Sequence, residues 1–360
     1  MPNRRGFLRG LLATGLAPSA TWADAGAPKL LSAARLPNGD FVLCGISESL
    51  DIVFQIPLPA RGHAAAAYPS KPHAIAFARR PGAFAVVVDC LSGEILQTVN
   101  SPPGRHFYGH GVFSQDGRWL YTTENDFEFA RGIVGVWDAS KNYERIAEFD
   151  SGGVGPHDIS RLQDSETLVV ANGGIETHPD AGRSKLNLPT MASNLSYIEN
   201  GSVVETVALG PEHQRNSIRH LSVAEDGLVA FGMQWEGQGH PRSLLGSHRR
   251  GSEPSLLDQN PTNVRRLEGY VGSVAVNGSA IMATYPRGGI AQLHVPSTAN
   301  AFRTIELEDV GGVARYGENF FVTTGKGNIA VLDASGDLER AKQYSLAFDN
   351  HLVAIAQPAI

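Results

Sequence analysis

Histidine is the residue type in this chain whose positions most directly suggest chemistry. Five of the twelve histidines each begin one of the short apolar runs that recur along the chain, and these are His63, His110, His157, His220 and His351. Neutral imidazole is a common ligand of iron, copper, zinc and nickel. Because metal–nitrogen bonds are only about 2.0–2.1 Å long, such ligands must converge from neighbouring segments. The shared position therefore predicts a transition-metal site, with iron the first candidate and copper the second.

Three further residues of metal-ligand type stand near this repeated position. His106 lies in the segment that leads into His110, Glu124 ends the following apolar run, and His178 lies in a long insertion. We expect these three either to bind the metal or to orient the residues that do.

Arginine and amide side chains also occur where the runs end. Arg183 and Lys185 lie in an insertion, where they favour either an anion site or a solvated lid. The residues that we expect to contact a bound group are Arg79, Arg105, Asn125, Asn172, Arg183 and Gln234. No glycine-rich phosphate loop stands out, so we expect no nucleotide cofactor.

Four short β-type runs separated by turn residues form the unit that repeats. The clearest pair of units begins at His63 and at His110, and similar units begin at His157, at His220, near Gly272 and near Gly311. Four antiparallel strands per repeat are typical of a β-propeller blade, whose innermost strand borders a central channel. Equivalent positions of these strands form a ring, so the fold would bring the histidines together at one mouth of the channel.

The two ends of the chain complete a seventh unit. The last apolar run begins at His351, and three runs near the N-terminus cover residues 30–36, 41–46 and 52–58. A last strand paired with the first three would close the ring and leave no open edge. We therefore predict an all-β, seven-bladed propeller, with six or eight blades as alternatives.

Two long insertions interrupt this rhythm. We place them at residues 173–194 and at about residues 235–263, each after the second strand of its unit. Loops of about 20 residues are uncommon in a compact domain and are usually functional. We expect both to rise over the histidine mouth, bringing His178 and either His240 or His248 toward it.

A structural role for the histidines is the main alternative. WD40-type propellers place Gly-His before the innermost strand and an aspartate at the end of the third, joined in a hydrogen-bond network. Gly62-His63 with Asp89, and Gly109-His110 with Asp138, fit that pattern. His157, His220 and His351 have no matching aspartate, so we favour a ring of ligands.

The N-terminus has the organisation of an export signal. The pair Arg4-Arg5 precedes Phe-Leu, and a short apolar stretch and small residues follow. This order is typical of a secretory signal, and the arginine pair specifies the twin-arginine route. We expect residues 1–25 to be removed, and residues 26–360 to form one periplasmic domain without a further membrane span.

The composition excludes some classes of partner and limits the disulfides that can form. A net charge of −6 argues against a nucleic-acid partner, which would require a basic face. Cys44 and Cys90 are the only cysteines, and either a disulfide between them or two core thiols would suit an exported protein. We expect a monomer.

A set of motifs spread over nearly the whole mature chain resembles a family of twin-arginine-exported bacterial propellers of unknown function. The motifs are Arg79-Arg80-Pro-Gly, Arg105-His-Phe-Tyr-Gly-His-Gly111, Thr123-Glu-Asn125, Gly155-Pro-His157, Ala171-Asn-Gly-Gly-Ile175 with His178, Gly182-Arg with Leu186-Asn-Leu, and Arg219-His220-Leu. The resemblance implies a periplasmic role in iron acquisition, beside imelysin-type proteins and di-haem oxidoreductases. It supplies no activity and no catalytic residue.

Three hypotheses follow from the sequence. The first is a periplasmic metal-binding propeller that takes part in iron uptake. The second is a non-catalytic platform on which another protein docks. The third is an enzyme acting on a small organic anion, which would need Arg183 and Glu124 near the channel mouth.

Overall fold

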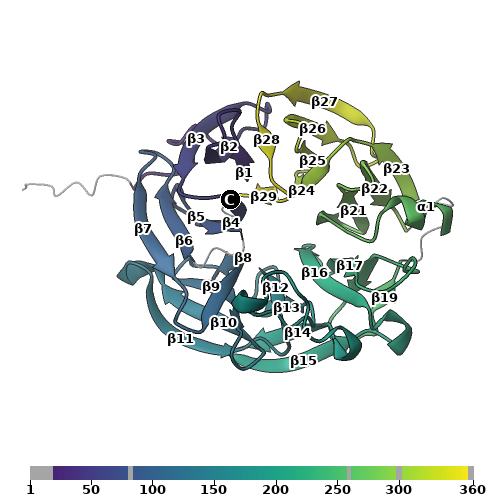
Figure 1. Cartoon of the computed structure of the whole chain (residues 1–360). Coiled ribbons are helices and arrows are strands. Elements are labelled where there is room, and N and C mark those ends of the chain that lie inside the picture. The colour runs from purple at the N-terminus through teal and green to yellow at the C-terminus, as the bar shows by residue number, and fades with distance from the viewer. Residues whose placement is uncertain (1–18, 80–83, 258–260, 297–301, 356–360) are drawn as a thin grey trace, which may run out of the picture.

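The computed structural model describes residues 19–79, 84–257, 261–296 and 302–355. Its strands form seven separate antiparallel sheets arranged around a central axis, as Figure 1 shows. This is a seven-bladed β-propeller, and the predicted fold class and blade number are both confirmed. The arginine pair of the expected export signal and Arg80 of one quoted motif lie outside the described residues.

The strands follow one another in chain order, four to each complete blade. The first two complete blades consist of β4 (Gly62–Ala67), β5 (His73–Ala78), β6 (Phe84–Asp89) and β7 (Ile95–Asn100), and of β8 (Arg105–Phe113), β9 (Trp119–Asp126), β10 (Arg131–Asp138) and β11 (Glu144–Asp150). The next two consist of β12 (Pro156–Arg161), β13 (Leu168–Asn172), β14 (Asn194–Glu199) and β15 (Ser202–Ala208), and of β16 (Asn216–Val223), β17 (Val229–Trp235), β18 (Leu245–His248) and β19 (Ser255–Leu256). The last two consist of β20 (Ser273–Asn277), β21 (Ala280–Tyr285), β22 (Ile290–His294) and β23 (Phe302–Glu306), and of β24 (Val310–Tyr316), β25 (Asn319–Thr324), β26 (Asn328–Leu332) and β27 (Leu338–Gln343).

The seventh blade joins the two ends of the chain. It contains β1 (Leu30–Arg35), β2 (Phe41–Ile46) and β3 (Ile52–Leu58) from the N-terminal part, and β28 (Ala347–Phe348) and β29 (Val353–Ala354) from the C-terminal part. Both C-terminal strands pair antiparallel with β1. Ring closure is therefore as predicted, but the expected single last strand is two short ones, and His351 lies in the segment between them.

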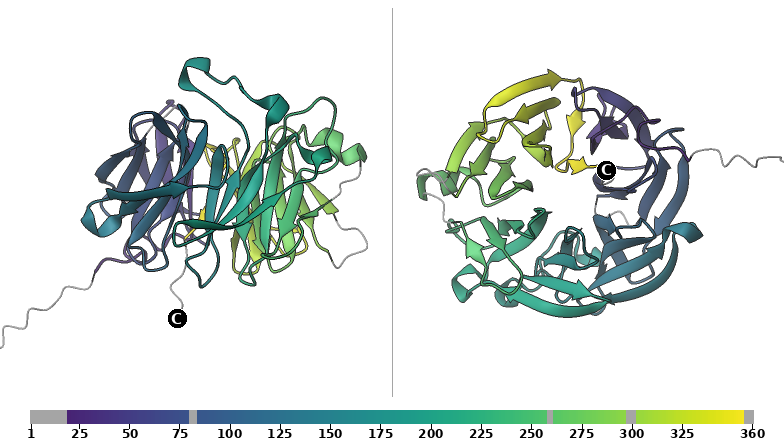
Figure 2. Two further views of the ribbon diagram at one scale, coloured as in Figure 1. Left: turned by 90° about the horizontal axis from the view of Figure 1, so that it is seen from below. Right: turned by 180° about the vertical axis from the view of Figure 1, so that it is seen from behind.

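Helices are few and short among the described residues. They are η1 (Ala139–Lys141), η2 (Pro179–Ala181), η3 (Leu188–Thr190), η4 (Pro211–His213) and α1 (Pro261–Arg266). None of these is long and apolar enough to cross a membrane. Both η2 and η3 belong to the segment between β13 and β14, which rises above one face of the ring in the side view of Figure 2.

Apolar side chains pack between the faces of adjacent blades, and they hold the ring together. One cluster, for example, joins Phe77 and Val87 of one blade to Phe107 and Trp137 of the next. Successive side chains of a strand point to opposite faces of the blade. Because each blade is covered on both sides by its neighbours, the inner strands carry apolar residues on both faces. The outermost strands β7, β11, β15 and β27 are largely exposed.

The second predicted insertion differs from the structure. Residues 235–263 are not one loop, because they contain β18 and β19, the third and fourth strands of their blade. The sequence Leu245-Gly-Ser-His248 has little β-type character, and its strand forms because it completes the sheet beside β17. The first insertion, between β13 and β14, is as predicted.

Two further features bear on the expected export. Cys44 and Cys90 are buried free thiols, so the structure holds no disulfide between them. The indole Nε1 of Trp22 donates to the carbonyl oxygen of Tyr68 at 2.9 Å, and Ala25 is buried against the seventh blade. Residues just before the expected start of the mature domain thus pack onto the propeller.

Candidate metal centre

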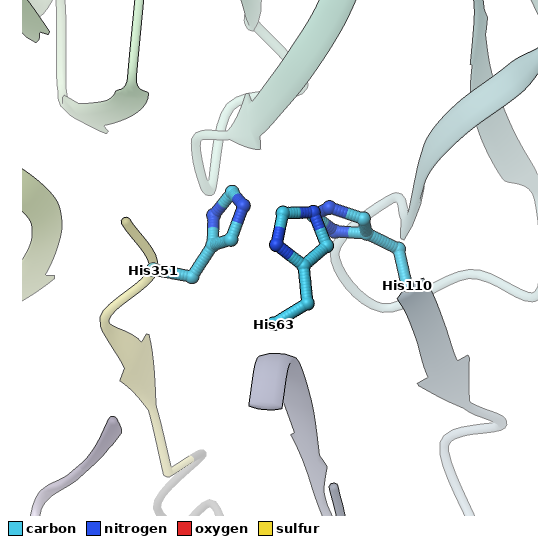
Figure 3. A group of neighbouring side chains, drawn as sticks. All are labelled: His63, His110 and His351. Atoms are coloured by element: carbon cyan, nitrogen blue, oxygen red, sulfur yellow. The ribbon is translucent and has the colours of Figure 1, made fainter. Parts of the chain in front are cut away.

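The five aligned histidines form one compact cluster in the channel. The ring centroid of His63 lies 4.5 Å from that of His351 and 5.0 Å from that of His110. On the other side of the cluster, the ring centroid of His157 lies 4.9 Å from that of His220. Figure 3 shows the rings of His63, His110 and His351 converging from β4, from β8 and from the segment between β28 and β29. The five histidines therefore converge as predicted, and their rings lie close enough to bind one metal ion together.

Irregular strand pairing aims these side chains into the channel. The register of the innermost strand shifts between Gly62 and Ala65, between Phe107 and Gly111, between Pro156 and Asp158, and between Ile218 and His220. A β-bulge places an extra residue on one strand and redirects its side chain. His110 and His220 consequently lie inside long strands. We had expected each of them to begin its strand, but both strands begin several residues earlier.

Four residues of the cluster are buried and His157 is half-buried, and several of the nitrogen atoms have no partner among the described residues. The exposed fraction is 2% for His220 and 5% for His110. The buried nitrogens without a hydrogen bond are His63 Nδ1, His110 Nε2, His157 Nδ1, His220 Nδ1 and Nε2, and His351 Nε2. Since buried polar atoms are nearly always bonded, so many unpartnered imidazole nitrogens at one place indicate a ligand site.

Burial also lowers the pKa of four of the five rings. Burial lowers the pKa of His220 to about 3, with the nearby Asp158 acting in the opposite direction. Burial, followed by repulsion from the neighbouring histidines, lowers the pKa of His63, His157 and His351 well below 6.5. A neutral imidazole offers a lone pair to a metal, so the ligands need not lose a proton at neutral pH.

Asp158 orients His110, and the sequence analysis did not single it out. Its Oδ1 lies 2.9 Å from His110 Nδ1, and its Oδ2 accepts a hydrogen bond from the backbone nitrogen of Leu221. Burial acts to raise the pKa of Asp158, but the interactions with His110 outweigh it, so the pKa lies below 3.8. An ionised carboxylate only accepts, so His110 Nδ1 is the donor, which leaves Nε2 as the atom that could bind a metal. Carboxylate–histidine–metal chains of this kind are common in metal sites.

Two groups of three histidines have ligand atoms close enough to hold one ion. The first contains His63, His110 and His351, and the second contains His110, His157 and His220, with ligand atoms within 4.8 Å of one another in each. His110 belongs to both, and its Nδ1 is bonded to Asp158. Only one His110 nitrogen is left for a metal, so the two groups describe alternative positions for one ion rather than two separate sites.

Gly109 makes room for this arrangement. It has a positive φ of 98°, and a Cβ built on it would lie 2.5 Å from Cδ2 of His63. An alanine at this position would therefore meet the imidazole ring as well as adopt a backbone conformation that side chains disfavour. Gly109 thus leaves space for the ring of His63. The Gly109-His110 sequence is explained by this packing and not by a WD40-type hydrogen-bond network.

The hydrogen bonds also contradict the WD40-type alternative. His110 bonds to Asp158 of the following blade, whereas Asp138 caps η1 by accepting from Ser140. His63 Nδ1 has no partner among the described residues, and Asp89 accepts from the turn that follows it.

His106 and His178 lie outside the cluster. The His106 ring stacks on Phe127, with ring centroids 6.0 Å apart, and its Nε2 lies 3.1 Å from Asn125 Nδ2. Asn125 also donates to the carbonyl oxygen of Thr177, which ties the insertion to β9. His178 accepts from the backbone of Asp180 at the start of η2. These residues support the wall beside the cluster rather than the cluster itself.

Glu124 and Arg105 belong to a separate ion-pair network. Glu124 is fully buried and accepts hydrogen bonds from Arg145 at 2.6 and 3.0 Å. Arg105 Nη2 donates to Glu148 at 2.8 Å, and Arg105 also faces Glu124 and Asp126. We had expected Glu124 to bind or support a metal ligand, but its oxygens are turned toward these arginines in the second complete blade.

Asn172 is occupied by contacts between strands. Its amide donates to Asn194 Oδ1 at 2.8 Å, and its Oδ1 accepts from Ser151 Oγ at 2.7 Å. His248 of the second predicted insertion is likewise buried in its blade, where its Nδ1 lies 2.7 Å from the hydroxyl of Tyr197. His240 is exposed.

The remaining predicted contacts do share one cavity with the histidines. Arg79, Arg183 and Gln234 line a cavity of about 450 Å³, together with His63 and His157. This cavity lies under the insertion that carries Arg183 and opens onto the histidine cluster. Arg219 and Arg287 also line it, and the sequence analysis did not include them among the expected contacts.

These features define a seven-bladed propeller with a buried histidine cluster in its channel and a cavity above it. Residues 56–355 match the family model described as a protein of unknown function (DUF1513), so the chain belongs to that family. The search of curated proteins found no match.

Proposed function

We propose that the protein binds one transition-metal ion at the histidine cluster. The observation that carries this proposal is the group of buried imidazole nitrogens without partners, which come from five separate segments of the ring. His110, oriented by Asp158, is the central ligand because it belongs to both candidate groups. His63 and His351, or His157 and His220, complete the set.

Iron is the metal that we propose first, with copper second, and the setting that we propose is iron uptake in the bacterial periplasm. The support for the periplasm is the arginine pair and apolar stretch at the N-terminus. The support for iron is the chemistry of imidazole, which suits iron, copper and zinc alike, together with the resemblance of the motifs to exported propellers found beside imelysin-type proteins and di-haem oxidoreductases. We propose that the protein acts as a monomer.

Metal titration of single variants tests the binding proposal. His110→Ala removes the ligand common to both groups, so we expect metal affinity to fall at least a hundredfold. His240→Ala is the matched control, because His240 is exposed and lies outside the cluster. Equal metal affinity in the wild type and the His110 variant would exclude the cluster as the site. Circular dichroism of each variant shows whether the propeller is intact.

The iron proposal needs its own measurement. A strain lacking the gene should grow more slowly than the parent when iron is limiting, and the wild-type gene should restore growth. The His110→Ala gene should fail to restore it. Full restoration by that variant would separate iron uptake from the histidine cluster and would contradict the proposal.

A further inference from the structure

The cavity above the histidines is strongly cationic in a protein of net negative charge. Five of the residues that line it are basic, namely Arg79, Arg183, Lys185, Arg219 and Arg287, and none of its lining residues is acidic. The whole chain carries a formal charge of −6. A concentration of positive charge in a concave site favours an anionic ligand, because the walls focus the field.

Two buried carboxylates position three of these five cations without neutralising the cavity. Arg79 pairs with Asp349 at 2.8 Å, and the Asp349 side chain is 6% exposed. Lys185 and Arg219 both pair with Glu236, whose side chain is 4% exposed. Two carboxylates against five cations leave a surplus of three positive charges facing the cavity.

Arg183 and Arg287 contribute most of the surplus. Arg287 donates to the backbone carbonyl of Glu268, its guanidinium lies 4.8 Å from the centre of the Tyr270 ring, and it has no ion pair with a carboxylate of the described residues. Arg183 is exposed at the rim, on the insertion between β13 and β14. Guanidinium groups bind carboxylates through two parallel hydrogen bonds, which gives such a rim both affinity and orientation.

The rest of the lining suits an organic rather than an inorganic anion. Ile175 and the rings of Tyr108 and Tyr270 provide apolar surface between the charges, and Ser217, Gln234 and Asn350 provide neutral polar groups. A volume of about 450 Å³ lies in the range of small-molecule sites. His63 and His157 form part of the same lining, so a ligand held by the cations would reach the metal position.

We propose that this cavity binds a small organic polycarboxylate that also coordinates the metal, so that the metal is held as a ternary complex. This inference rests on the proposed metal site and names its second ligand. The histidines supply nitrogen ligands from below, and the carboxylates supply oxygen ligands from above while their other oxygens bind arginine. A hard ion such as Fe³⁺ favours oxygen ligands, which the histidine cluster does not provide.

Citrate is a suitable probe, because it distinguishes a ternary complex from simple removal of the metal. Protein loaded with Fe³⁺ is mixed with radiolabelled citrate and passed through a desalting column. We expect protein, iron and citrate to elute together in near-equal amounts. Citrate that elutes with the iron at the small-molecule volume would overturn the inference, while iron retained by protein in the absence of citrate would leave the proposed metal site standing. Protein that retains no metal under either condition would end both proposals.

Two arginine variants test the recognition itself. Arg183→Gln and Arg287→Gln should each weaken citrate binding to the metal-loaded protein about tenfold or more. Arg303→Gln is the matched control, because Arg303 lies on the outermost strand β23 and pairs with Asp337. Unchanged citrate affinity in both cavity variants would overturn the inference. Loss of metal from these variants in the absence of citrate would do the same, because it would assign the arginines to the metal centre.

A comparison of citrate with inorganic pyrophosphate tests whether the cavity prefers carboxylates to other polyanions. The lining predicts that citrate binds at least tenfold more tightly than pyrophosphate at the same ionic strength. Tighter binding of pyrophosphate would contradict a carboxylate ligand and would assign the cavity to phosphates.

Discussion

Unpartnered nitrogen atoms make the histidines of the cluster unlike ordinary buried histidines. Both nitrogens of His220 are buried without a hydrogen bond among the described residues. Leaving a buried polar group unsatisfied costs about 1–3 kcal/mol, so the metal-free cluster reduces the stability of the fold. Such a cost is expected where a site is arranged for a ligand rather than for stability.

Replacement of one such histidine by an apolar residue should therefore stabilise the metal-free protein. We expect His220→Leu to raise the free energy of unfolding by about 1 kcal/mol, because the apolar side chain is similar in size and leaves no polar atom unbonded. Urea unfolding of the metal-free protein measures this. The same variant should bind metal more weakly. A stability loss of 1 kcal/mol or more would instead indicate that His220 is a structural histidine.

Substitution of Asp158 tests whether its hydrogen bond to His110 supports metal binding. Asp158→Asn keeps the shape of the side chain but removes the charge that fixes the proton on Nδ1 of His110. Loss of such an orienting partner lowers metal affinity by about 10- to 100-fold, and we expect a change in this range. Competition with a coloured chelator measures the affinity. Unchanged affinity would show that His110 does not depend on Asp158.

The bulges of the innermost strands determine where the histidines point. The sequence predicted that equivalent positions would converge, because a repeat places like residues alike in every blade. It did not predict Asp158 as the partner of His110, because the two residues belong to different blades and Asp158 follows His157 as an ordinary strand residue. We had expected Glu124 to lie beside the metal, whereas its carboxylate accepts hydrogen bonds from Arg145 of the outermost strand β11.

Substitution of Gly109 tests whether close packing of the inner strands positions His63. Gly109→Ala would bring its Cβ into contact with the ring of His63, so we expect metal affinity to fall about tenfold or more. Gly93→Ala is the matched control, because Gly93 also has a positive φ, of 79°, but has no atoms within 4 Å of the added Cβ. Both variants should lose about 1–2 kcal/mol of stability from backbone strain. Equal metal affinity in the two would contradict the role of Gly109.

The ring as a whole was the most predictable level of the structure. Regular spacing of short apolar runs indicated seven blades, and the lone C-terminal run indicated how the ring closes. The second insertion was misjudged because β18 and β19 carry Gly, Ser and His instead of β-branched residues. The lining of the cationic cavity was predicted only in part, through Arg79, Arg183, Lys185 and the neutral Gln234. Arg219 and Arg287 come from other blades, and only the ring brings them together.

Burial of neutral histidines predicts how the stability of the metal-free protein depends on pH. In the unfolded chain these histidines have a pKa near 6.5, while in the folded protein the pKa of His220 is about 3. Below pH 6.5 the unfolded chain therefore binds more protons than the folded protein, and stability falls as the pH falls toward 3. Each such histidine contributes a slope of about 1.4 kcal/mol per pH unit.

Urea unfolding at pH 7.5, 6.0 and 5.0 measures this dependence. We expect the free energy of unfolding to be highest at pH 7.5 and to decrease at each step, and we expect the slope to be shallower in the His220→Leu variant. Equal stability at the three pH values would show that the histidines take up protons in the folded state, and therefore that they are not buried as described.

Elemental analysis of the protein purified without a histidine tag or chelators tests the central claim most directly. We expect close to one transition-metal ion per chain, with iron before copper, and we expect the ion to be lost from the His110→Ala variant. A chain that carries no metal, and that takes up neither iron, copper nor zinc on titration, would contradict the account.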